Sequence, residues 1–176
     1  QAWPEPAAVE VSLAAFESAI GIRLPEDYRR FMLRFGGGYP YPNSFDSAII
    51  RAGGVISSDP RMYVEFFYSI AEMQGHWQRE TYGDGTPPGM AMIGDEPGGT
   101  EVLLSLRPQD FGVVYLWLGR TNVWGTDGND ESALHRQADT FNAFLASLDD
   151  TPDKAGYEHW SIPRNLASAR EFDLPI

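Results

Sequence analysis

Apolar residues recur every three or four positions over the first 35 residues, and this spacing predicts two helices that form a hairpin. The first helix, expected over about residues 7–20, carries its apolar stripe on Val9, Leu13, Phe16 and Ile20. The second begins at Pro25, which suits a first helical position, and its apolar face consists of Tyr28, Phe31, Met32 and Phe35. Three glycines at 36–38 end this helix.

From residue 39 the pattern changes from helical to extended. Residues 39–45, rich in Pro, Tyr and Asn, predict a loop, and the aromatic and β-branched run 63–68 predicts a strand. A short helix is expected over residues 70–82, followed by a Gly- and Pro-rich loop over 83–89.

Three further strands are expected in quick succession, over residues 90–94, 100–106 and 113–118. Because the connections between them are short, the strands are expected to pair antiparallel. The third of these strands carries apolar or aromatic side chains on both faces, which indicates a central strand with one face beneath helices.

A last helix is expected over about residues 131–148, with Asn129 or Asp130 as its cap. Its apolar stripe consists of Leu134, Ala138, Phe141, Leu145 and Leu148. The order of helices, then strands, then a helix predicts an α+β fold rather than a βαβ fold. We expect a single domain over residues 1–176, with a core at about 9–148 and a C-terminal extension at 149–176.

The composition supports a packed, water-soluble domain. Hydrophobic residues make up 43 % of the chain and cysteine is absent, which excludes disulfides and thiolate metal sites and fits the reducing cytoplasm as the expected compartment. No apolar run approaches the roughly 20 residues that a membrane helix needs. The first ten residues lack the basic and apolar regions of a signal peptide.

The formal net charge of −12 argues against nucleic acid or an anionic membrane as a partner. Two interpretations remain: a solvated surface, or a surface that meets a basic partner. Residues 127–158 carry eight acidic and two basic residues, and their net charge of −6 is half of the excess. A local field of one sign accelerates the capture of an oppositely charged partner.

Motifs for catalysis are sparse. The phosphate-binding glycine loops, the HExxH zinc motif and the GxSxG nucleophile motif do not occur. His76, His135 and His159 lack metal-ligand spacing, and the stretch from Asp127 to Glu131 departs from a calcium loop because Ser132 replaces the required glycine. We therefore expect no catalytic residue, no cofactor and no metal.

Two local features allow both a functional and a structural interpretation. Asp95 and Glu96 end an expected strand before a Pro-Gly-Gly turn, where they could perform acid–base work or bond the backbone of the turn. Trp124 lies in a Gly- and Asp-rich stretch, where it could serve as a protein-binding hot spot or seal the edge of the core.

Several segments occur in an order that resembles a known family. They are Phe16-Glu17 with Gly21, Leu-Pro-Glu-Asp-Tyr at 24–28 with Phe31 and the glycines at 36–38, Met-Ile-Gly-Asp at 92–95 leading through Gly98-Gly99 to Val-Leu-Leu-Ser at 102–105, Gly-Val-Val-Tyr-Leu-Trp at 112–117, and Ala-Asp-Thr-Phe-Asn-Ala-Phe-Leu-Ala-Ser-Leu at 138–148. Together they resemble the SUKH superfamily of Smi1/Knr4-like proteins over about residues 9–148. The chain departs from a minimal member in the segment 39–62 and in the tail after Asp149.

The resemblance implies a curved, mainly antiparallel sheet with helices packed around it. Bacterial members of the superfamily are mostly immunity proteins of polymorphic toxin and contact-dependent systems, which bind and neutralise a cognate toxin, often a nuclease, inside the producing cell. Eukaryotic relatives suggest the alternative of a regulatory or scaffolding domain with an endogenous partner. The resemblance supplies no catalytic triad or metal site.

We therefore expect an immunity protein that acts by stoichiometric binding, and its acidic character suits a basic, nuclease-type toxin. The contact residues that we predict all lie on expected loops near strand ends: Asp84, Asp95, Glu96, Trp124, Asp127 and Asp130. An enzyme that uses Asp95 and Glu96 is the remaining hypothesis, and two carboxylates converging in a deep pocket would support it.

Overall fold

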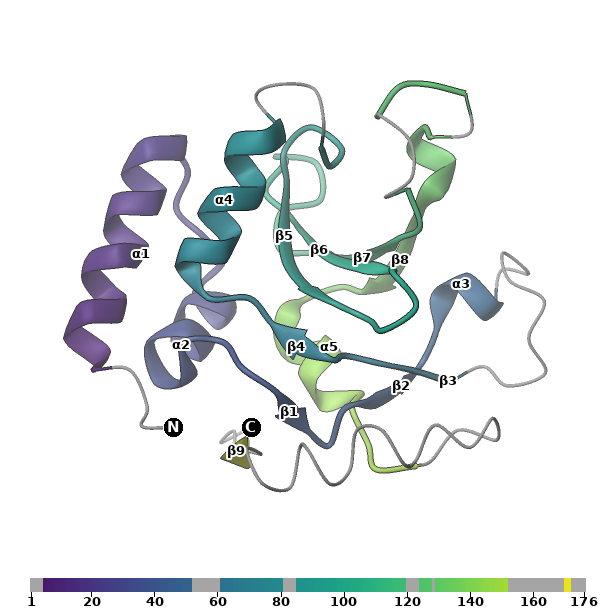
Figure 1. The fold of residues 1–176 in the computed structure, drawn as a ribbon, viewed down its shortest axis with the longest axis horizontal. Helices are drawn as coiled ribbons and strands as arrows, with labels where there is room; N and C mark the ends of the chain where they lie inside the picture. The colour runs from purple at the N-terminus through teal and green to yellow at the C-terminus, as the bar shows by residue number, and fades with distance from the viewer. Residues whose placement is uncertain are drawn as a thin grey trace.

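A computed structural model describes residues 5–51, 61–80, 85–119, 124–127, 129–151 and 170–171 (Figure 1). The helices are α1 (Pro6–Ile20), α2 (Glu26–Phe35), α3 (Ala48–Arg51), α4 (Ile70–Glu80), the 3₁₀-helix η1 (Glu131–Ala133) and α5 (Phe141–Ala146). The strands are β1 (Pro40–Tyr41), β2 (Ser44–Asp46), β3 (Arg61–Tyr63), β4 (Phe66–Phe67), β5 (Met90–Asp95), β6 (Glu101–Ser105), β7 (Val114–Trp117), β8 (Leu134–Ala138) and β9 (Arg170–Glu171).

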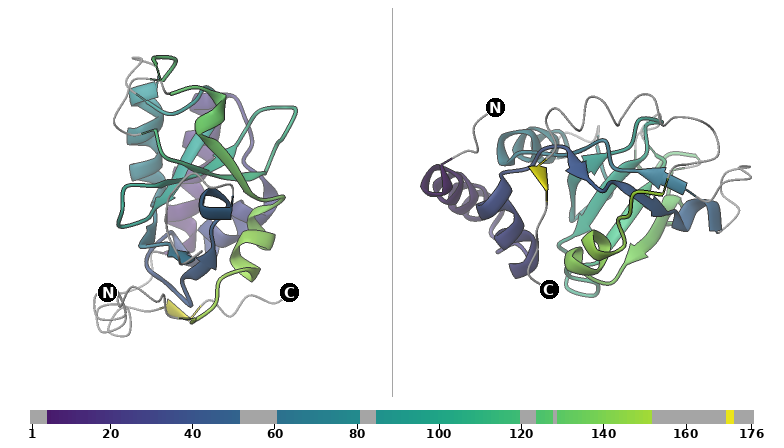
Figure 2. Two further views of the ribbon diagram at one scale, coloured as in Figure 1. Left: turned by 90° about the vertical axis from the view of Figure 1, so that its right-hand side faces the viewer. Right: turned by 90° about the horizontal axis from the view of Figure 1, so that it is seen from below.

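The main sheet has five antiparallel strands in the order β4-β5-β6-β7-β8. Two smaller pairs accompany it: β2 with β3, antiparallel, and β1 with β9, parallel. Figure 1 shows the main sheet strongly curved, with α4 beside β5, α1 on the outer side of α4, and α5 below the strands. Seen from below in Figure 2, α1 and α2 lie on one side of the molecule and α5 lies against the sheet. The predicted α+β fold with a curved, mainly antiparallel sheet is confirmed.

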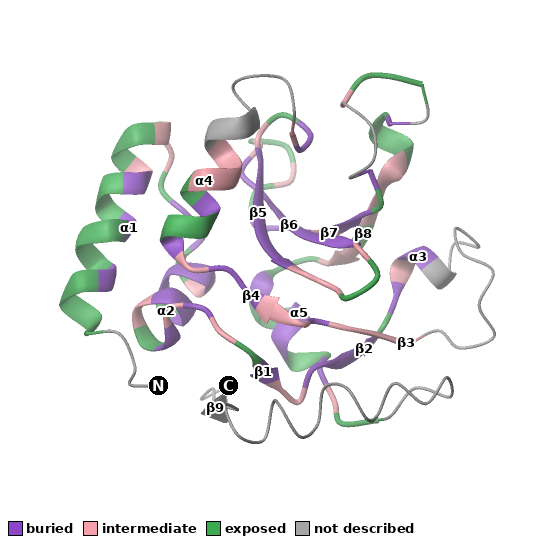
Figure 3. Ribbon diagram, in the orientation of Figure 1, coloured by how far each residue is buried: buried purple, intermediate pink, exposed green. Residues whose placement is uncertain are grey.

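The two faces of the main sheet bury different clusters. Side chains alternate across a strand, so Val102 and Leu104 of β6 join the main core while Leu103 between them joins a second cluster. The main core receives apolar residues from α1, α2, α4 and α5. Strand β6 is buried throughout and β5 is buried as far as Gly94, whereas Figure 3 shows the outer side of α1 exposed.

The second cluster lies on the opposite face of the sheet. Its buried members are Tyr68, Met90, Met92, Leu103 and Trp117, with Phe66, Tyr115, Trp124, Ala133 and Leu134 packed against them. Among the described residues, none of the α-helices contributes an apolar side chain to this cluster. The apolar members of this face therefore come from strands, loops and η1, and α4 adds the ring of His76 against Tyr68.

The prediction of a single helix over residues 131–148 is wrong. The segment forms η1, then β8, then α5, and Thr140 caps α5 by accepting a hydrogen bond from the Ala143 N–H. The apolar spacing fits a helix, but β8 pairs with β7, with a register shift between Val114 and Tyr115. Its side chains divide between the faces: Leu134 packs on the second cluster and Ala138 on the main core. Asp130 does act as a cap, although for η1 rather than for an α-helix.

Three smaller expectations also change. The expected loop 39–45 contains β1 and part of β2, and the expected strand 63–68 is divided between β3 and β4, which belong to different sheets. Pro25 is the residue before α2 rather than its first residue. The central position of the third expected strand is confirmed, because β7 lies between β6 and β8.

Gly37 links α2 to the edge of the sheet, and its replacement is expected to be costly. Gly37 has φ +90°, and an added Cβ would lie 2.7 Å from the carbonyl oxygen of Phe67. We expect Gly37→Ala to lower the free energy of unfolding by about 2–4 kcal/mol, because both the backbone conformation and the contact resist a side chain.

The matched control for Gly37 is Gly21→Ala. Gly21 also has a positive φ, +70°, but an added Cβ there meets nothing within 4 Å. Its expected cost is only the conformational one, about 1 kcal/mol. Urea denaturation of both variants checks the difference, and equal losses would show that the contact with the Phe67 carbonyl is unimportant.

Candidate partner-binding surface

The strand register brings two of the predicted loops to the same end of the main sheet. Asp95 of β5 lies opposite Glu101 of β6, Glu101 lies opposite Trp117 of β7, and Trp117 lies opposite Leu134 of β8. The β5–β6 turn and the β7–β8 loop therefore project from the same end of the main sheet. At about 4.8 Å between neighbouring strands, this end of the sheet extends roughly 19 Å from β4 to β8.

The β5–β6 turn carries Asp95 and Glu96. The Glu96 N–H donates to the Thr100 carbonyl, and the Glu96 carbonyl accepts from the Gly99 N–H. The Glu96 carboxylate accepts from the Gly98 N–H at 2.8 Å. Burial, with a smaller contribution from Glu65, raises the pKa of Glu96 despite these hydrogen bonds. The Glu96 carboxylate thus stabilises the turn, as the structural interpretation of this pair expects, although the residue remains half-exposed.

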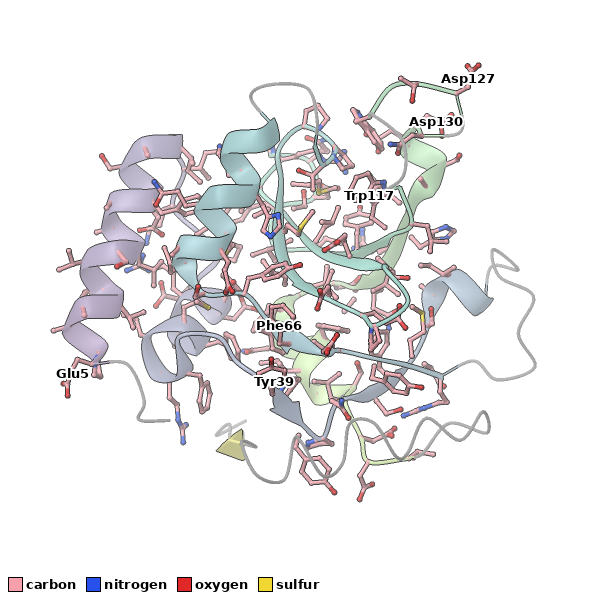
Figure 4. The ribbon with its side chains drawn as sticks, viewed as in Figure 1. Glu5, Tyr39, Phe66, Trp117, Asp127 and Asp130 are labelled. Carbon is pink, nitrogen blue, oxygen red and sulfur yellow. The ribbon has the colours of Figure 1, made fainter. Side chains whose placement is uncertain are left out.

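The β7–β8 loop is held by hydrogen bonds at its base and is exposed to solvent at its tip. The indole N–H of buried Trp117 donates to Asn129 Oδ1 at 3.3 Å, and the Asn129 amide donates to the Gly119 carbonyl at 3.1 Å. Trp124 is half-buried, with its ring 6.3 Å from that of Trp117. Figure 4 shows Trp117 below the loop that carries Asp127 and Asp130.

The two acids of this loop differ in role. Asp127 lies exposed at the tip. Asp130 is exposed as well, but its carboxylate accepts from both the backbone N–H and the hydroxyl of Ser132, and these hydrogen bonds lower its pKa. Trp124 is accordingly an anchor against the second cluster, and Asp127 is the freely presented acid of the loop.

We call the five described candidates on these two loops the acidic rim: Asp95, Glu96, Trp124, Asp127 and Asp130. The structure places them at one end of the sheet but on two separate loops. The sixth candidate, Asp84, lies outside the described residues.

A polar network centred on the β6–β7 turn had no signal in the sequence. The Arg107 guanidinium donates to both Asp110 and Glu131, and Asp110 also accepts from the hydroxyls of Ser105 and Tyr115. Burial alone would raise the pKa of Asp110, but these hydrogen bonds and the charge of Arg107 bring it below its ordinary value. The network ties the β6–β7 turn to the start of η1.

A row of aromatic residues at the β4 edge was also missed. Tyr39 is 44 % exposed, and its ring lies 5.7 Å from that of Phe66. The sequence did not predict this contact, because nothing local in the Pro- and Tyr-rich stretch 39–45 indicates that it lies beside a strand.

Two further findings concern metals and membranes. Within the described ranges, no group of three or more His, Asp or Glu side chains is arranged to hold a metal ion. No helix in those same ranges has the length and apolar character required to cross a bilayer.

Comparison with known proteins agrees with this architecture. The profile of the SMI1 / KNR4 family (SUKH-1) matches residues 7–147. The chain is also similar to the SPbeta prophage-derived uncharacterized protein YokK of Bacillus subtilis (strain 168), with 26 % identity over 157 residues that cover 83 % of this chain and 77 % of YokK. No solved structure matches the chain. The family match spans both helices of the hairpin, all five strands of the main sheet and α5, and the chain therefore belongs to the SMI1 / KNR4 family (SUKH-1).

Proposed function

We propose that this protein is an immunity protein that neutralises a cognate toxin by stoichiometric binding in the cytoplasm of the producing cell. The observation that carries the proposal is membership of the SUKH-1 family, whose match extends over residues 7–147. The proposed action is binding without catalytic turnover, and it requires no cofactor.

The charge of the protein supports a basic toxin, such as a nuclease. The formal net charge is −12, and the acidic rim presents exposed Asp127 beside half-buried Trp124. Aromatic anchors next to charged side chains are typical of protein-binding hot spots, and a negative field increases the association rate of a positive partner. Acids on such a surface can occupy the region of a nuclease that otherwise meets phosphate.

Neutralisation can be tested by co-expression with the polypeptide encoded immediately upstream of this gene. We expect this chain to restore growth of a host that expresses that polypeptide, and the purified proteins to form a complex of fixed stoichiometry. Absence of protection would refute the proposal and would favour a regulatory or scaffolding domain with an endogenous partner. Protection by far less than one equivalent would contradict binding as the mechanism.

The contribution of the acidic rim is tested by charge reversal at its exposed acid. We expect Asp127→Lys to weaken binding of the upstream polypeptide by about 10-fold, mainly through slower association, because an exposed charge acts chiefly on the encounter. Glu10→Lys is the matched control, since Glu10 is exposed on α1, which contributes to the opposite, helix-covered side of the fold. Equal affinities of the two variants in surface plasmon resonance would remove Asp127 from the contact surface.

A further inference from the structure

The aromatic side chains at the β4 edge form a continuous row from solvent to the interior. The ring of Phe66 lies 5.7 Å from Tyr39 and 5.0 Å from Tyr68, and the ring of Tyr68 lies 4.7 Å from that of His76 on α4. Tyr39 is 44 % exposed, Phe66 is half-buried and Tyr68 is buried. Figure 4 shows Tyr39 and Phe66 adjacent to each other, well away from Asp127. The exposed ring is thus held in place by the rings behind it.

Carboxylates border this row. Phe66 lies directly opposite Asp95 in the sheet register, and the Glu65 N–H donates to the Asp95 carbonyl at 2.9 Å. Glu65 is close enough to Glu96 to contribute to the raised pKa of that group. Within the part of the chain that the structure describes, neither Glu65 nor Glu96 takes part in an ion pair. Phe66, within the aromatic row, therefore lies among several negative charges.

Exposure alone does not distinguish this place from the rest of the surface. Phe111 on the β6–β7 turn is 48 % exposed, yet it stacks on no other aromatic ring among the described residues. Single exposed apolar residues are common on soluble proteins. The β4 edge differs because an exposed ring, a half-buried ring and acidic neighbours meet at one point, on the sheet face to which the α-helices contribute no apolar cluster member.

We propose that Tyr39, Phe66, Glu65, Asp95 and Glu96 form an edge aromatic surface that binds an arginine-bearing segment of the toxin. The occupant follows from the charge and shape of the surface. A guanidinium stacks on aromatic rings and pairs with carboxylates through its planar fork, whereas an ammonium group does neither as well. The identity of the partner as a toxin rests on the proposed function, while the preference for arginine rests on the surface itself.

The edge aromatic surface shares Asp95 and Glu96 with the acidic rim. The shared pair lies on the β5–β6 turn, between β4 at one edge of the sheet and the β7–β8 loop near the other. The arginine-binding surface therefore extends the rim toward β4. A partner that spans roughly 19 Å of this sheet end contacts both.

Arginine recognition can be tested without any toxin. The probe is an amidated Gly-Arg-Gly-Arg-Gly peptide, titrated into the full chain and followed by NMR of the aromatic side chains. We expect saturable shifts of the Tyr39 and Phe66 resonances. The same peptide with citrulline, which keeps the shape of arginine but lacks its charge, is expected to leave them unchanged. Shifts confined to other residues, or equal shifts with citrulline, would overturn the proposal.

Variants of the exposed ring separate packing from recognition. Tyr39→Ala is expected to weaken peptide binding by about 5-fold, and Tyr39→Phe, which keeps the ring face, is expected to bind like the parent. Phe111→Ala is the matched control for loss of an exposed ring, and Glu65→Gln tests the charge without removing any aromatic group. Binding that survives Tyr39→Ala undiminished would exclude the ring as a contact.

The same variants distinguish failure of this inference from failure of the proposed function. If the peptide binds at Tyr39 but the chain gives no protection from the upstream polypeptide, the arginine-binding surface is supported and the immunity function is refuted. If protection occurs and Tyr39→Ala leaves the affinity for that polypeptide unchanged, the inference is wrong and the function stands. Self-association of the parent that is lost in Tyr39→Ala would assign the surface to a second copy of this chain and would also overturn the proposal.

Discussion

Replacing Phe141 by alanine is expected to lower the free energy of unfolding by about 3–5 kcal/mol, the range found for fully buried phenylalanines. Phe141 begins α5, is fully buried, and its ring lies 4.9 Å from Tyr28, 5.0 Å from Phe31 and 5.6 Å from Phe67. It thus joins α5 to α2 and to the edge strand β4. Its removal leaves a cavity where three elements meet, and such a junction has little freedom to collapse.

Urea denaturation followed by tryptophan fluorescence measures this effect. The control is Phe111→Ala, which removes the same side chain from a site that is 48 % exposed, and we expect a loss below about 0.5 kcal/mol. The slope of the free energy against urea is expected to stay constant. A loss below about 1 kcal/mol for Phe141→Ala would mean that α5 does not pack into the main core.

Replacing Glu17 by alanine is the second large perturbation that we expect. Glu17 on α1 forms an ion pair with Arg29 on α2, and the side chains are only 13 % and 10 % exposed. The same carboxylate accepts a hydrogen bond from the Leu24 N–H at 2.7 Å. Glu17→Ala leaves the Arg29 charge nearly buried without its partner and removes the acceptor of a link residue, so we expect a loss of about 3–5 kcal/mol.

A double variant distinguishes the two causes of this loss. Adding Arg29→Met to Glu17→Ala removes the uncompensated charge, and the double variant is expected to recover part of the stability lost by Glu17→Ala alone. Glu10→Ala, at an exposed position of the same helix, is expected to cost less than about 0.5 kcal/mol. If the double variant were as unstable as the two single changes combined, the buried charge could not be the main cause.

These contacts explain why particular residues carry the family resemblance. Glu17 and the Leu24-Pro25 link are among the residues that carry the resemblance, and in the structure they form the junction of the helical hairpin. Phe141 likewise appears as one member of a helical stripe, and the structure makes it the point where α5 meets α2 and β4. These residues serve the fold, and the predicted contact residues lie elsewhere.

The α1–α2 hairpin, its glycine stop and the three central strands β5, β6 and β7 could be predicted because their signals are local. Helical periodicity, a glycine with positive φ such as Gly36, and short connections between strands each act within a few residues. The two helices and the antiparallel strands therefore appear close to their expected bounds. The α+β class followed from their order along the chain.

The candidate site was predictable only in part. The sequence indicated that Asp95, Glu96 and the residues around Trp124 lie at strand ends, and the structure agrees. The two loops share one end of the sheet because the three antiparallel strands pair in chain order, and the register Asp95–Glu101–Trp117 fixes which residues meet there. The contact between Tyr39 and Phe66 could not be predicted, because the two residues are 27 positions apart in the chain and only the bridge between Gly38 and Phe67 brings their segments together.

Segment 134–138 shows most clearly where local pattern ends and tertiary structure decides. Its apolar spacing is compatible with a helix, yet its backbone pairs with β7 and its side chains divide between two clusters. Spacing along the chain determined which elements this protein has in its hairpin and central strands. Pairing between strands decided which residues lie side by side at the acidic rim, and at the β4 edge it joined segments far apart in the chain, because hydrogen bonds across a sheet depend on neighbours outside the local sequence.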